Sequence, residues 1–596
     1  MSGLFQRLVD NLPERYAPTK TSFACDGKSL RNWLTQLPLA NPGATARLLI
    51  GALREMNQLR VDPQQRLDAL ELLRGPIDQI VATLSRQVLG DRFPLPAQKL
   101  KLGQLAQDFE HEMALGYRSV ICDLCGPAGA VPFLRGKAAG LALTRAIQHY
   151  GACLYQVYLR YHAPPPGIWQ SLHDLFRFAV AVQLDDKAAA DPLRVNVPLS
   201  ARLAYIHALL LALSNPYRFT QKENGDIHLL TRIWASHCDV REGRAPIGAI
   251  AIRTDSDRSL GYLPEEREAP SEGLLALEIS GLVRQLEGQL AMLPAGMDSI
   301  QFRPPGGGEI NTRVELIRQL MGTWDSSSER NQARLAAGHM LDSVIGLHDL
   351  HYVLAGNVGF EAYLRKTRGL AISLHEGDQV ASWASAAGEA TVQIKRLPAK
   401  VLDQSLGGYR VLWEHIEGVR VRVGELVGLA PPADEDEPQD WMVGCIRWLR
   451  IDPGGSMDAG IELLARRTVP VAVRSIDNQG VPRTVMRGVS LDALDQADST
   501  RSAIVVPQTF DMATREIELT RPGDPFAWPS EPHVDTLCVV DARENGGGYL
   551  RLVVDIATNQ HDNGDADIPA AANDDPNVNG PTVPGSDRPV NDAVSR

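Results

Sequence analysis

Two short polar motifs carry the residue types best suited to binding a phosphate-bearing or purine ligand. Arg330 and Arg334 are four residues apart, a spacing that places both side chains on one side of a helical turn or a tightened loop. Each guanidinium can pair bidentately with phosphate oxygens or with the O6/N7 edge of guanine. Further along, Asp403, Ser405 and Gly408 form the pattern D-x-S-x-x-G. The carboxylate can accept from a guanine N–H, the hydroxyl can bond to a base or a phosphate, and the glycine permits a tight backbone turn.

The order of these motifs resembles the PilZ domain, a family of cyclic-di-GMP receptors. Three later segments match as well: residues 423–427 resemble a v-G-x-x-v turn, residues 443–448 a G-x-v-x-W strand, and residues 460–463 a closing G-v-x-F strand with Leu463 in place of the aromatic. The resemblance implies an antiparallel β-barrel over residues 326–475 that binds cyclic di-GMP. It assigns ligand contact to Arg330, Arg334, Asp403, Ser405 and Gly408.

The two motifs are farther apart than in PilZ domains, with 69 positions between the second arginine and the aspartate. An insertion over residues 355–391 accounts for this distance, because the flanking segments still match. Arg365 and Arg368 lie nearer to the second motif but have R-x-x-R spacing, and we expect them to be surface charges on the insertion. A second R-x-x-x-R, Arg483 to Arg487, follows the D-x-S-x-x-G motif and therefore has the wrong order.

Residues 1–225 have the pattern of consecutive helices. Asp62-Pro63 supplies an N-cap and a first-turn proline, and apolar residues then recur at helical spacing from Leu67 to Val88, with a bend expected at Gly75-Pro76. Similar patterns cover residues 141–161, 168–182 and 199–213. We expect an α-helical domain built as an array of α-hairpins, without a strict sequence repeat.

Residues 226–325 are expected to form a mixed α/β domain that links the two halves. Short β-like segments cover residues 227–233 and 247–252. Helical patterns follow at residues 274–293 and 311–324.

The C-terminal half changes to a period of two. Residues 419–423 and 441–451 alternate apolar and polar side chains, which predicts strands with one buried face. Strand patterns continue through a C-terminal β segment, residues 476–557, with a hairpin turn at Asn545-Gly546. The polar tail, residues 558–596, is expected to be disordered. The predicted fold class is multidomain α+β: a mainly α-helical N-terminal half, a PilZ-like antiparallel β-barrel and a further β segment.

Composition and charge argue against several classes of function. The chain has 596 residues, too many for one core, and its net charge of −12 argues against a general nucleic-acid or anionic-membrane binder. Seven cysteines without a repeating spacing predict free thiols in a reducing cytoplasm. The apolar run of residues 203–213 is too short to span a bilayer, and charges interrupt the N-terminal stretch where a signal peptide needs an apolar core. We therefore expect a soluble, cytoplasmic bacterial protein without membrane insertion.

No metal site or catalytic centre is expected. Cys122 and Cys125 have zinc-like C-x-x-C spacing, and His348 and His351 could complete a site, but a second C-x-x-C is missing. Buried thiols in a helical region are the simpler interpretation, and the histidines are expected to face opposite sides of the first barrel strand. Common nucleotide, hydrolase and zinc-protease motifs are absent, and the glycine-rich residues 304–308 are interpreted as a turn.

These observations predict a cyclic-di-GMP-binding effector rather than an enzyme, with no cofactor. The whole layout is similar to FimW-type receptors linked to type IV pili and surface attachment, which implies a protein partner in the pilus or motility machinery. Binding is expected to draw the loop with Arg330 and Arg334 onto the barrel and to change how the two halves pack. Two alternatives stay open: a PilZ-fold scaffold that has lost the nucleotide and acts through protein contacts, and a helical enzyme that carries a regulatory barrel.

Overall fold

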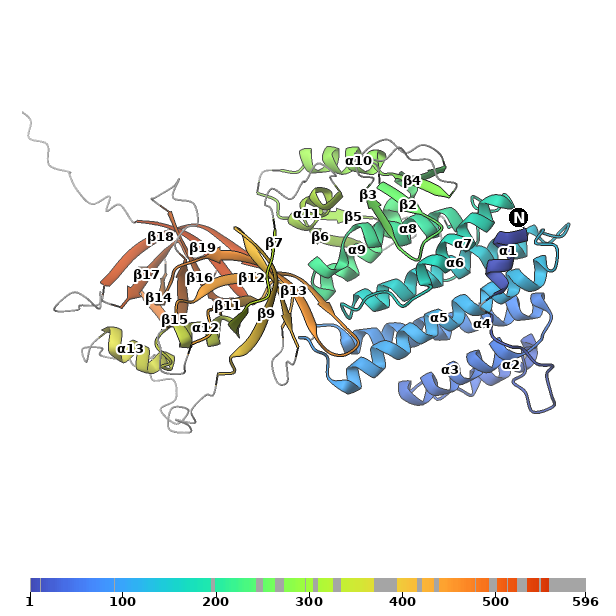
Figure 1. Ribbon diagram of the computed structural model, residues 1–596, viewed down its shortest axis with the longest axis horizontal. Coiled ribbons are helices and arrows are strands. Elements are labelled where there is room, and N and C mark those ends of the chain that lie inside the picture. Colours follow the sequence, from blue (N-terminus) through green and yellow to red (C-terminus); the bar gives the residue numbers. More distant parts are fainter. Residues whose placement is uncertain are drawn as a thin grey trace, which may run out of the picture. The chain divides into compact units, whose positions relative to one another are not determined.

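Helices make up the N-terminal part of the computed structural model and strands dominate its C-terminal part (Figure 1), which confirms the predicted α+β class. The structure describes residues 2–10, 12–90, 92–194, 199–242, 250–262, 273–294, 296–303, 309–324, 334–368, 394–414, 421–433, 439–477, 479–491, 501–511, 513–522, 533–545 and 548–556. Arg330, most of the expected insertion and the expected tail lie outside these residues.

The N-terminal domain is helical, as its apolar periodicity predicts. Its helices are α1 (Ser2–Val9), α2 (Gly27–Thr35), α3 (Pro42–Gln58), α4 (Pro63–Val88), α5 (Ala97–Cys125), α6 (Gly136–Tyr158), α7 (Ile168–Ala181), α8 (Ala201–Leu213) and α9 (Gln221–Trp234). The Asp62 carboxylate accepts hydrogen bonds from two backbone N–H groups and so starts α4 at Pro63. Helix α5 packs against both α4 and α6. No helix in the described part of the chain is long and apolar enough to cross a membrane.

Residues 227–233 belong to helix α9, so the strand predicted there is wrong. A capping box between Thr220 and Glu223 starts the helix, and Ile227, Leu230 and Trp234 are buried at helical spacing. A short apolar run does not by itself distinguish a helix from a strand, and here the cap and the packing decide for the helix.

The mixed domain contains more strand than predicted. The expected helix over residues 274–293 is a strand followed by a helix, and the expected helix over residues 311–324 begins as a strand. The elements are β1 (Asp239–Glu242), β2 (Ile250–Arg253), β3 (Leu260–Tyr262), β4 (Leu274–Glu278), α10 (Ser280–Ala291), β5 (Ser299–Phe302), β6 (Ile310–Arg313) and α11 (Val314–Trp324). The sheet order β1-β4-β2-β3 explains the first difference, because β4 is paired on both sides and its leucines are mostly buried.

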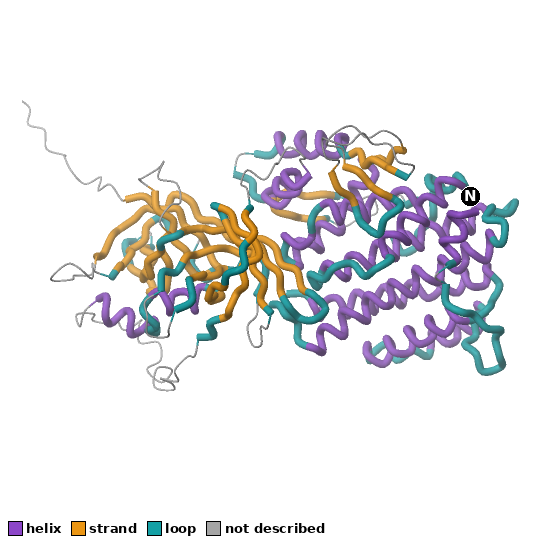
Figure 2. Tube along the Cα trace, viewed as in Figure 1, coloured by secondary structure: helices purple, strands orange, loops and turns teal. Residues whose placement is uncertain are grey.

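Six antiparallel strands close into a first barrel. They are β8 (Met340–Ile345), β9 (Leu397–Ser405), β10 (Gly408–Trp413), β11 (Leu426–Ala430), β12 (Met442–Ile451) and β13 (Met457–Ala465). Their order is β10-β13-β12-β11-β8-β9, and the pairing of β9 with β10 closes the ring. The short β7 (Leu335–Ala336) adds to β9 from outside the ring. Figure 2 shows these strands in orange, apart from the purple helices of the N-terminal domain.

The segment after β8 is helix α12 (Leu347–Leu354), so the prediction that His348 and His351 lie on a barrel strand is wrong. His351 is buried against Phe360 and Tyr363 of helix α13 (Phe360–Arg368), and this burial lowers its pKa to about 4. The apolar side of α12 packs against strands of two barrels, which is why the chain is helical at this point.

The predicted C-terminal β segment is a second closed barrel. Its strands are β14 (Thr468–Ile476), β15 (Pro482–Leu491), β16 (Arg501–Pro507), β17 (Glu516–Arg521), β18 (His533–Asn545) and β19 (Tyr549–Ile556). They close in the order β14-β15-β16-β19-β18-β17, so this barrel begins eight residues before residue 476. Asn545 pairs with Tyr549, as a hairpin at this position requires, while Gly546 lies outside the described residues.

The helical domain and the first barrel share one packed junction. Phe93 and Val421 exchange two backbone hydrogen bonds of 2.7 Å each, and the Ile451 N–H donates to the Tyr161 carbonyl at 2.9 Å. Phe93 and Tyr161 also join the apolar core of the barrel, beside Trp413. The junction is therefore a continuation of the barrel core rather than a surface contact.

A buried hydrogen-bond chain inside the first barrel gives a test of this fold. The Trp413 indole donates to the Ser343 hydroxyl at 2.9 Å, and that hydroxyl donates to the Leu397 carbonyl at 2.8 Å. Ser343→Ala leaves the indole N–H without an acceptor, which is expected to cost about 1–3 kcal/mol of unfolding free energy in urea titrations. Ser236→Ala, at an exposed hydroxyl, is the control and should cost less than about 0.5 kcal/mol. Equal stability of the two variants would contradict the buried chain.

Candidate ligand-binding site

The D-x-S-x-x-G motif forms the β9–β10 hairpin. Ser405 ends β9, two residues make the turn, and Gly408 begins β10 directly opposite Ser405. The Ser405 hydroxyl donates to the Gly408 carbonyl at 3.4 Å, which supports the turn. Asp403 lies opposite Arg410 in the same ladder. The hairpin therefore brings an aspartate and an arginine side by side.

A β-bulge decides which way Asp403 faces. Val401 is opposite Val411 and Asp403 is opposite Arg410, so Leu402 has no partner on β10. Strict alternation would put Asp403 on the inward face with the fully buried Val401. The extra residue reverses the alternation and aims Asp403 outwards, beside Arg410.

Arg334 is brought to Asp403 by strand β7. Leu335 and Ala336 pair with Gln404 and Asp403, so the residue before β7 lies beside the end of β9, within reach of the aspartate. The Arg334 guanidinium donates to Asp403 Oδ1 at 2.5 Å, with 40% of the arginine side chain and 21% of the aspartate side chain exposed. The two predicted motifs thus meet across 69 positions of sequence. Arg330 lies outside the described residues.

Three residues absent from the predicted set complete the site. Arg410 binds Asp458 bidentately, at 3.0 Å through Nε and 2.7 Å through Nη2, and its Nη1 lies 3.8 Å from Asp403 Oδ2. The hydrogen bond to Asp458 raises the pKa of Arg410. The Arg410 guanidinium also lies 5.9 Å from the centre of the Trp448 ring. Arg410 could have been identified from the sequence by assuming a two-residue hairpin turn, because such a turn places residues 403 and 410 opposite each other.

A transverse row across four strands explains how these groups come together. Asp403, Arg410, Gly460 and Trp448 are successive partners on β9, β10, β13 and β12. A Cβ atom on Gly460 would lie 1.9 Å from Trp448 Nε1, so the indole lies directly over the glycine backbone. The missing side chain at Gly460 lets the indole approach the guanidinium. The G-x-v-x-W and G-v-x-F segments of the sequence contain Trp448 and Gly460, but the sequence does not show that these two residues lie opposite each other.

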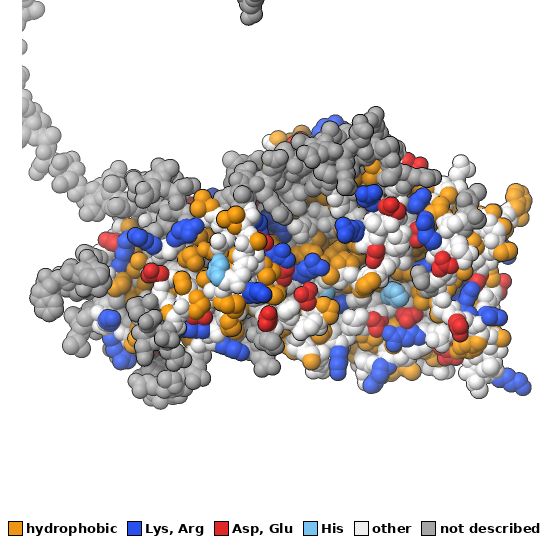
Figure 3. Space-filling view, in the orientation of Figure 1, with side chains coloured by type: hydrophobic (Ala, Val, Ile, Leu, Met, Phe, Trp, Pro, Cys, Tyr) orange, Lys and Arg blue, Asp and Glu red, His pale blue; other side chains and the backbone are white. Residues whose placement is uncertain are grey.

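The arrangement suits an anionic ligand with flat bases. Two half-exposed guanidinium groups can pair with phosphate or with a guanine edge, Asp403 can accept from a guanine N–H, and the indole offers a stacking face. On the face shown in Figure 3, basic and acidic side chains are interspersed. Asp403 and Asp458 hold the two arginines in place in the free protein.

The other candidate arginines have different surroundings. Arg365 of α13 is exposed and pairs with Glu361 one helical turn away, at 3.7 Å, as expected for a surface charge. Arg483 and Arg487 lie on β15 of the second barrel, and Arg487 stacks over Phe360 at 5.4 Å.

The C-x-x-C pair is buried in helix α5. Burial raises the pKa of Cys122 to about 12 and that of Cys125 to about 11, so the thiolate form is disfavoured at both positions. Within the described ranges, no group of three or more His, Cys, Asp or Glu side chains is arranged to hold a metal ion.

Comparison with known proteins gives matches over most of the chain. A family described as "Cyclic-di-GMP receptor FimW, N-terminal domain" matches residues 28–245, and one described as "Cyclic-di-GMP receptor FimW, middle PilZ domain" matches residues 249–396 and 372–470. The Cyclic-di-GMP receptor FimW of Pseudomonas aeruginosa is 24% identical over 540 residues, which cover 82% of this chain and 86% of that protein. The five predicted site residues all fall inside the segments matched by the middle PilZ domain.

Gly408 has a structural role that a substitution can separate from ligand contact. A Cβ atom at this position would lie 2.1 Å from the Ile461 carbonyl oxygen on β13, so Gly408→Ala must move backbone. We expect it to destabilise the barrel by about 3 kcal/mol or more in denaturant titrations followed by tryptophan fluorescence. Gly454→Ala, in the β12–β13 turn with open space around it, is the matched control. A Gly408 variant as stable as the Gly454 variant would show that this close approach is absent.

Proposed function

This chain belongs to the FimW family of PilZ-domain cyclic-di-GMP receptors, and we propose that it binds cyclic di-GMP on the outer face of its first barrel. Arg330 and Arg334 bind phosphate or guanine edges, Asp403 accepts from a guanine, and Ser405 bonds to base or phosphate. Arg410 and Trp448 extend the same surface. Gly408 shapes the hairpin that carries these groups.

The observation that carries this proposal is the contact between Arg334 and Asp403. Two motifs separated by 69 positions meet at 2.5 Å, on a closed barrel that also contains the three later PilZ-like segments at β11, β12 and β13. An exposed ion pair contributes about 0.2–1 kcal/mol, so a ligand that satisfies both partners can replace it at low cost. In the complex, Arg334 turns to phosphate or guanine and Asp403 accepts from the base.

Ligand binding acts as a switch through the segment that carries Arg330. This segment joins α11 to β7. Trp324 at the end of α11 is buried against Trp234, with 5.8 Å between the centres of the two rings. Both ends of the segment are therefore anchored, one on the helical and mixed domains and one on the barrel. Fixing the two arginines on a ligand changes the packing between these parts about the Phe93 junction.

The output of the switch is a protein contact rather than a reaction. The helical domain presents Phe133 and Leu134 on its surface, 91% and 87% exposed, between α5 and α6. A neighbouring pair of exposed apolar side chains is suited to a protein partner, which we place in the pilus or motility machinery. The cysteine pattern supports a cytoplasmic location. Neither nucleic-acid binding nor membrane insertion is part of this function.

Calorimetric titration of cyclic di-GMP into the full chain tests the receptor function. We expect micromolar or tighter binding by the wild type. Arg330→Ala, Arg334→Ala and Asp403→Ala should each weaken it tenfold or more, about 1.4 kcal/mol, because each removes a charged partner of the ligand.

Arg483→Ala is the control for this titration, since it removes an exposed arginine from the other R-x-x-x-R motif. It should bind like the wild type. The absence of heat from the wild type at ligand concentrations well above micromolar would overturn the receptor function and favour the scaffold that acts only through protein contacts.

Complementation of a deletion strain tests the partner function separately. The wild type should restore surface attachment, and Arg334→Ala should not, because it cannot respond to the ligand. A Phe133→Asp, Leu134→Asp double variant should bind cyclic di-GMP normally in vitro yet fail to restore attachment, because it loses the partner surface. Full restoration by both variants would contradict the proposed coupling.

A further inference from the structure

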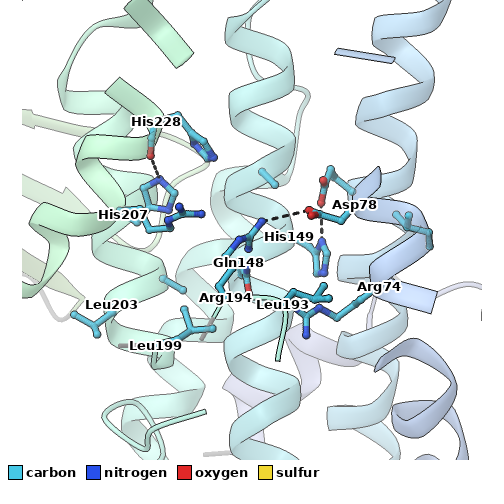
Figure 4. Close-up of a pocket in the computed structure, with 15 residues that line it drawn as sticks. Arg74, Asp78, Gln148, His149, Leu193, Arg194, Leu199, Leu203, His207 and His228 are labelled. Carbon is cyan, nitrogen blue, oxygen red and sulfur yellow. Dashed lines mark hydrogen bonds and ion pairs between the residues drawn. The ribbon is translucent and has the colours of Figure 1, made fainter. Parts of the chain in front are cut away.

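A cavity of about 70 Å³ lies inside the helical domain, lined by residues of α4, α5, α6, α8 and α9. His207 and His228 line it from α8 and α9, while Asp78 and His149 line it from α4 and α6 (Figure 4). A water molecule needs about 10–15 Å³ measured in this way, so the space holds about five water-sized groups. This is enough for an inorganic phosphate or a small carboxylate.

Most charged groups around the cavity already have partners. The pairs are Arg74 with Glu71 (3.0 Å) and Asp191 (2.7 Å), Arg194 with Asp78 (3.3 Å), and His149 with Glu110 (2.6 Å). Each carboxylate that lines the cavity is therefore already engaged with a cationic or imidazole partner. Figure 4 marks the Arg194–Asp78 pair with a dashed line.

Arg232 lacks a direct ion-pair partner, and the carboxylates of Asp191 and Asp78 act on its charge only from a distance. It lines the cavity from α9, forms no ion pair or side-chain hydrogen bond within the described part of the chain, and its Nε is buried without a partner. Burial and the nearby Arg194 lower its pKa to about 10, so the guanidinium stays charged at neutral pH. A partly buried charge without a partner is costly, and an anion in the cavity would offset that cost.

Two imidazoles also present buried nitrogen atoms without partners. These are His149 Nε2 and His228 Nδ1. The His207 Nε2–H donates to the His228 carbonyl at 3.1 Å, which fixes the His207 ring at the cavity wall. Burial, with Arg232 next in effect, lowers the pKa of His207 to about 3, so this ring is neutral at physiological pH. The neutral His228 ring can carry its proton on Nδ1 and donate it to an anion. The Nδ1 of His149 donates to Glu110, so the free Nε2 of an uncharged His149 ring can accept a hydrogen bond from a P–OH or carboxylic O–H group.

We propose that this cavity is a binding site for a small phosphate- or carboxylate-bearing anion, with Arg232 as its counter-charge and His149 and His228 as hydrogen-bond partners. Ile77, Leu199 and Leu203 form an apolar wall that limits the ligand to a compact molecule. The site is independent of the barrel site, because it uses other elements and other arginines.

Titration with inorganic phosphate and with acetate, each against sodium chloride at equal ionic strength, tests this proposal. The full chain with Arg334→Ala is used as the background, so that the barrel arginine does not contribute. We expect millimolar or tighter binding of at least one of the two anions by calorimetry. Arg232→Gln should weaken it at least tenfold, whereas Arg86→Gln, an exposed arginine on α4, should leave it unchanged.

Hydrogen exchange in the unsubstituted protein gives a measurement that does not depend on the folding of a variant. The bound anion should slow amide exchange in α8 and α9. In the calorimetric titration, binding of phosphate but not acetate would indicate a phosphate-bearing ligand, and binding of acetate but not phosphate would indicate a carboxylate-bearing ligand. Three outcomes would each overturn the proposal, whatever the result with cyclic di-GMP. They are no binding of either anion at about 50 times a millimolar dissociation constant, binding that Arg232→Gln does not weaken, and amide exchange that is unchanged in both helices.

Discussion

The backbone ladder of β9 is the constraint on which both the first barrel and its site depend. Its first residues pair with β8, and its last residues pair with β10 on one side and β7 on the other. The same strand therefore closes the barrel, receives the segment that carries Arg334, and forms the hairpin with Arg410. The bulge at Leu402 lets one strand fill the core with Leu397, Ala399 and Val401 and still present Asp403 to the outside.

The barrel is connected to the rest of the protein on two sides. On one side, Phe93 and Tyr161 of the helical domain enter its core. On the other side, α12 shares its apolar face between the two barrels. Glu425 lies buried near the first of these connections, between Arg92 at 3.6 Å and Arg422 at 3.2 Å, and burial raises its pKa. A change on the barrel surface therefore has packed routes to both neighbours.

The two arginine-rich sites differ in how their charges are balanced. On the barrel, Arg334 and Arg410 are half-exposed and are held by aspartates, so water and carboxylates share the stabilisation of their charge. In the helical domain, the neighbouring carboxylates are engaged with Arg74, Arg194 and His149, and Arg232 is left without one. The first arrangement favours exchange of partners when a large ligand arrives. The second favours a ligand that supplies the missing charge itself.

The sequence by itself determined the helical N-terminal domain and the β-rich second half, and its resemblance to PilZ domains pointed to Arg334, Asp403, Ser405 and Gly408 as candidate site residues. These features depend on local signals: apolar periodicity, caps and motif spacing. Tertiary structure decided the rest. The packing of α9 overrode a strand-like apolar run, α12 formed because it is covered by two barrels, and the C-terminal strands closed into a ring. The outward aim of Asp403, the row that joins Arg410 to Trp448 and the cavity around Arg232 depend on ladder register and on helices distant in sequence, which no local pattern encodes.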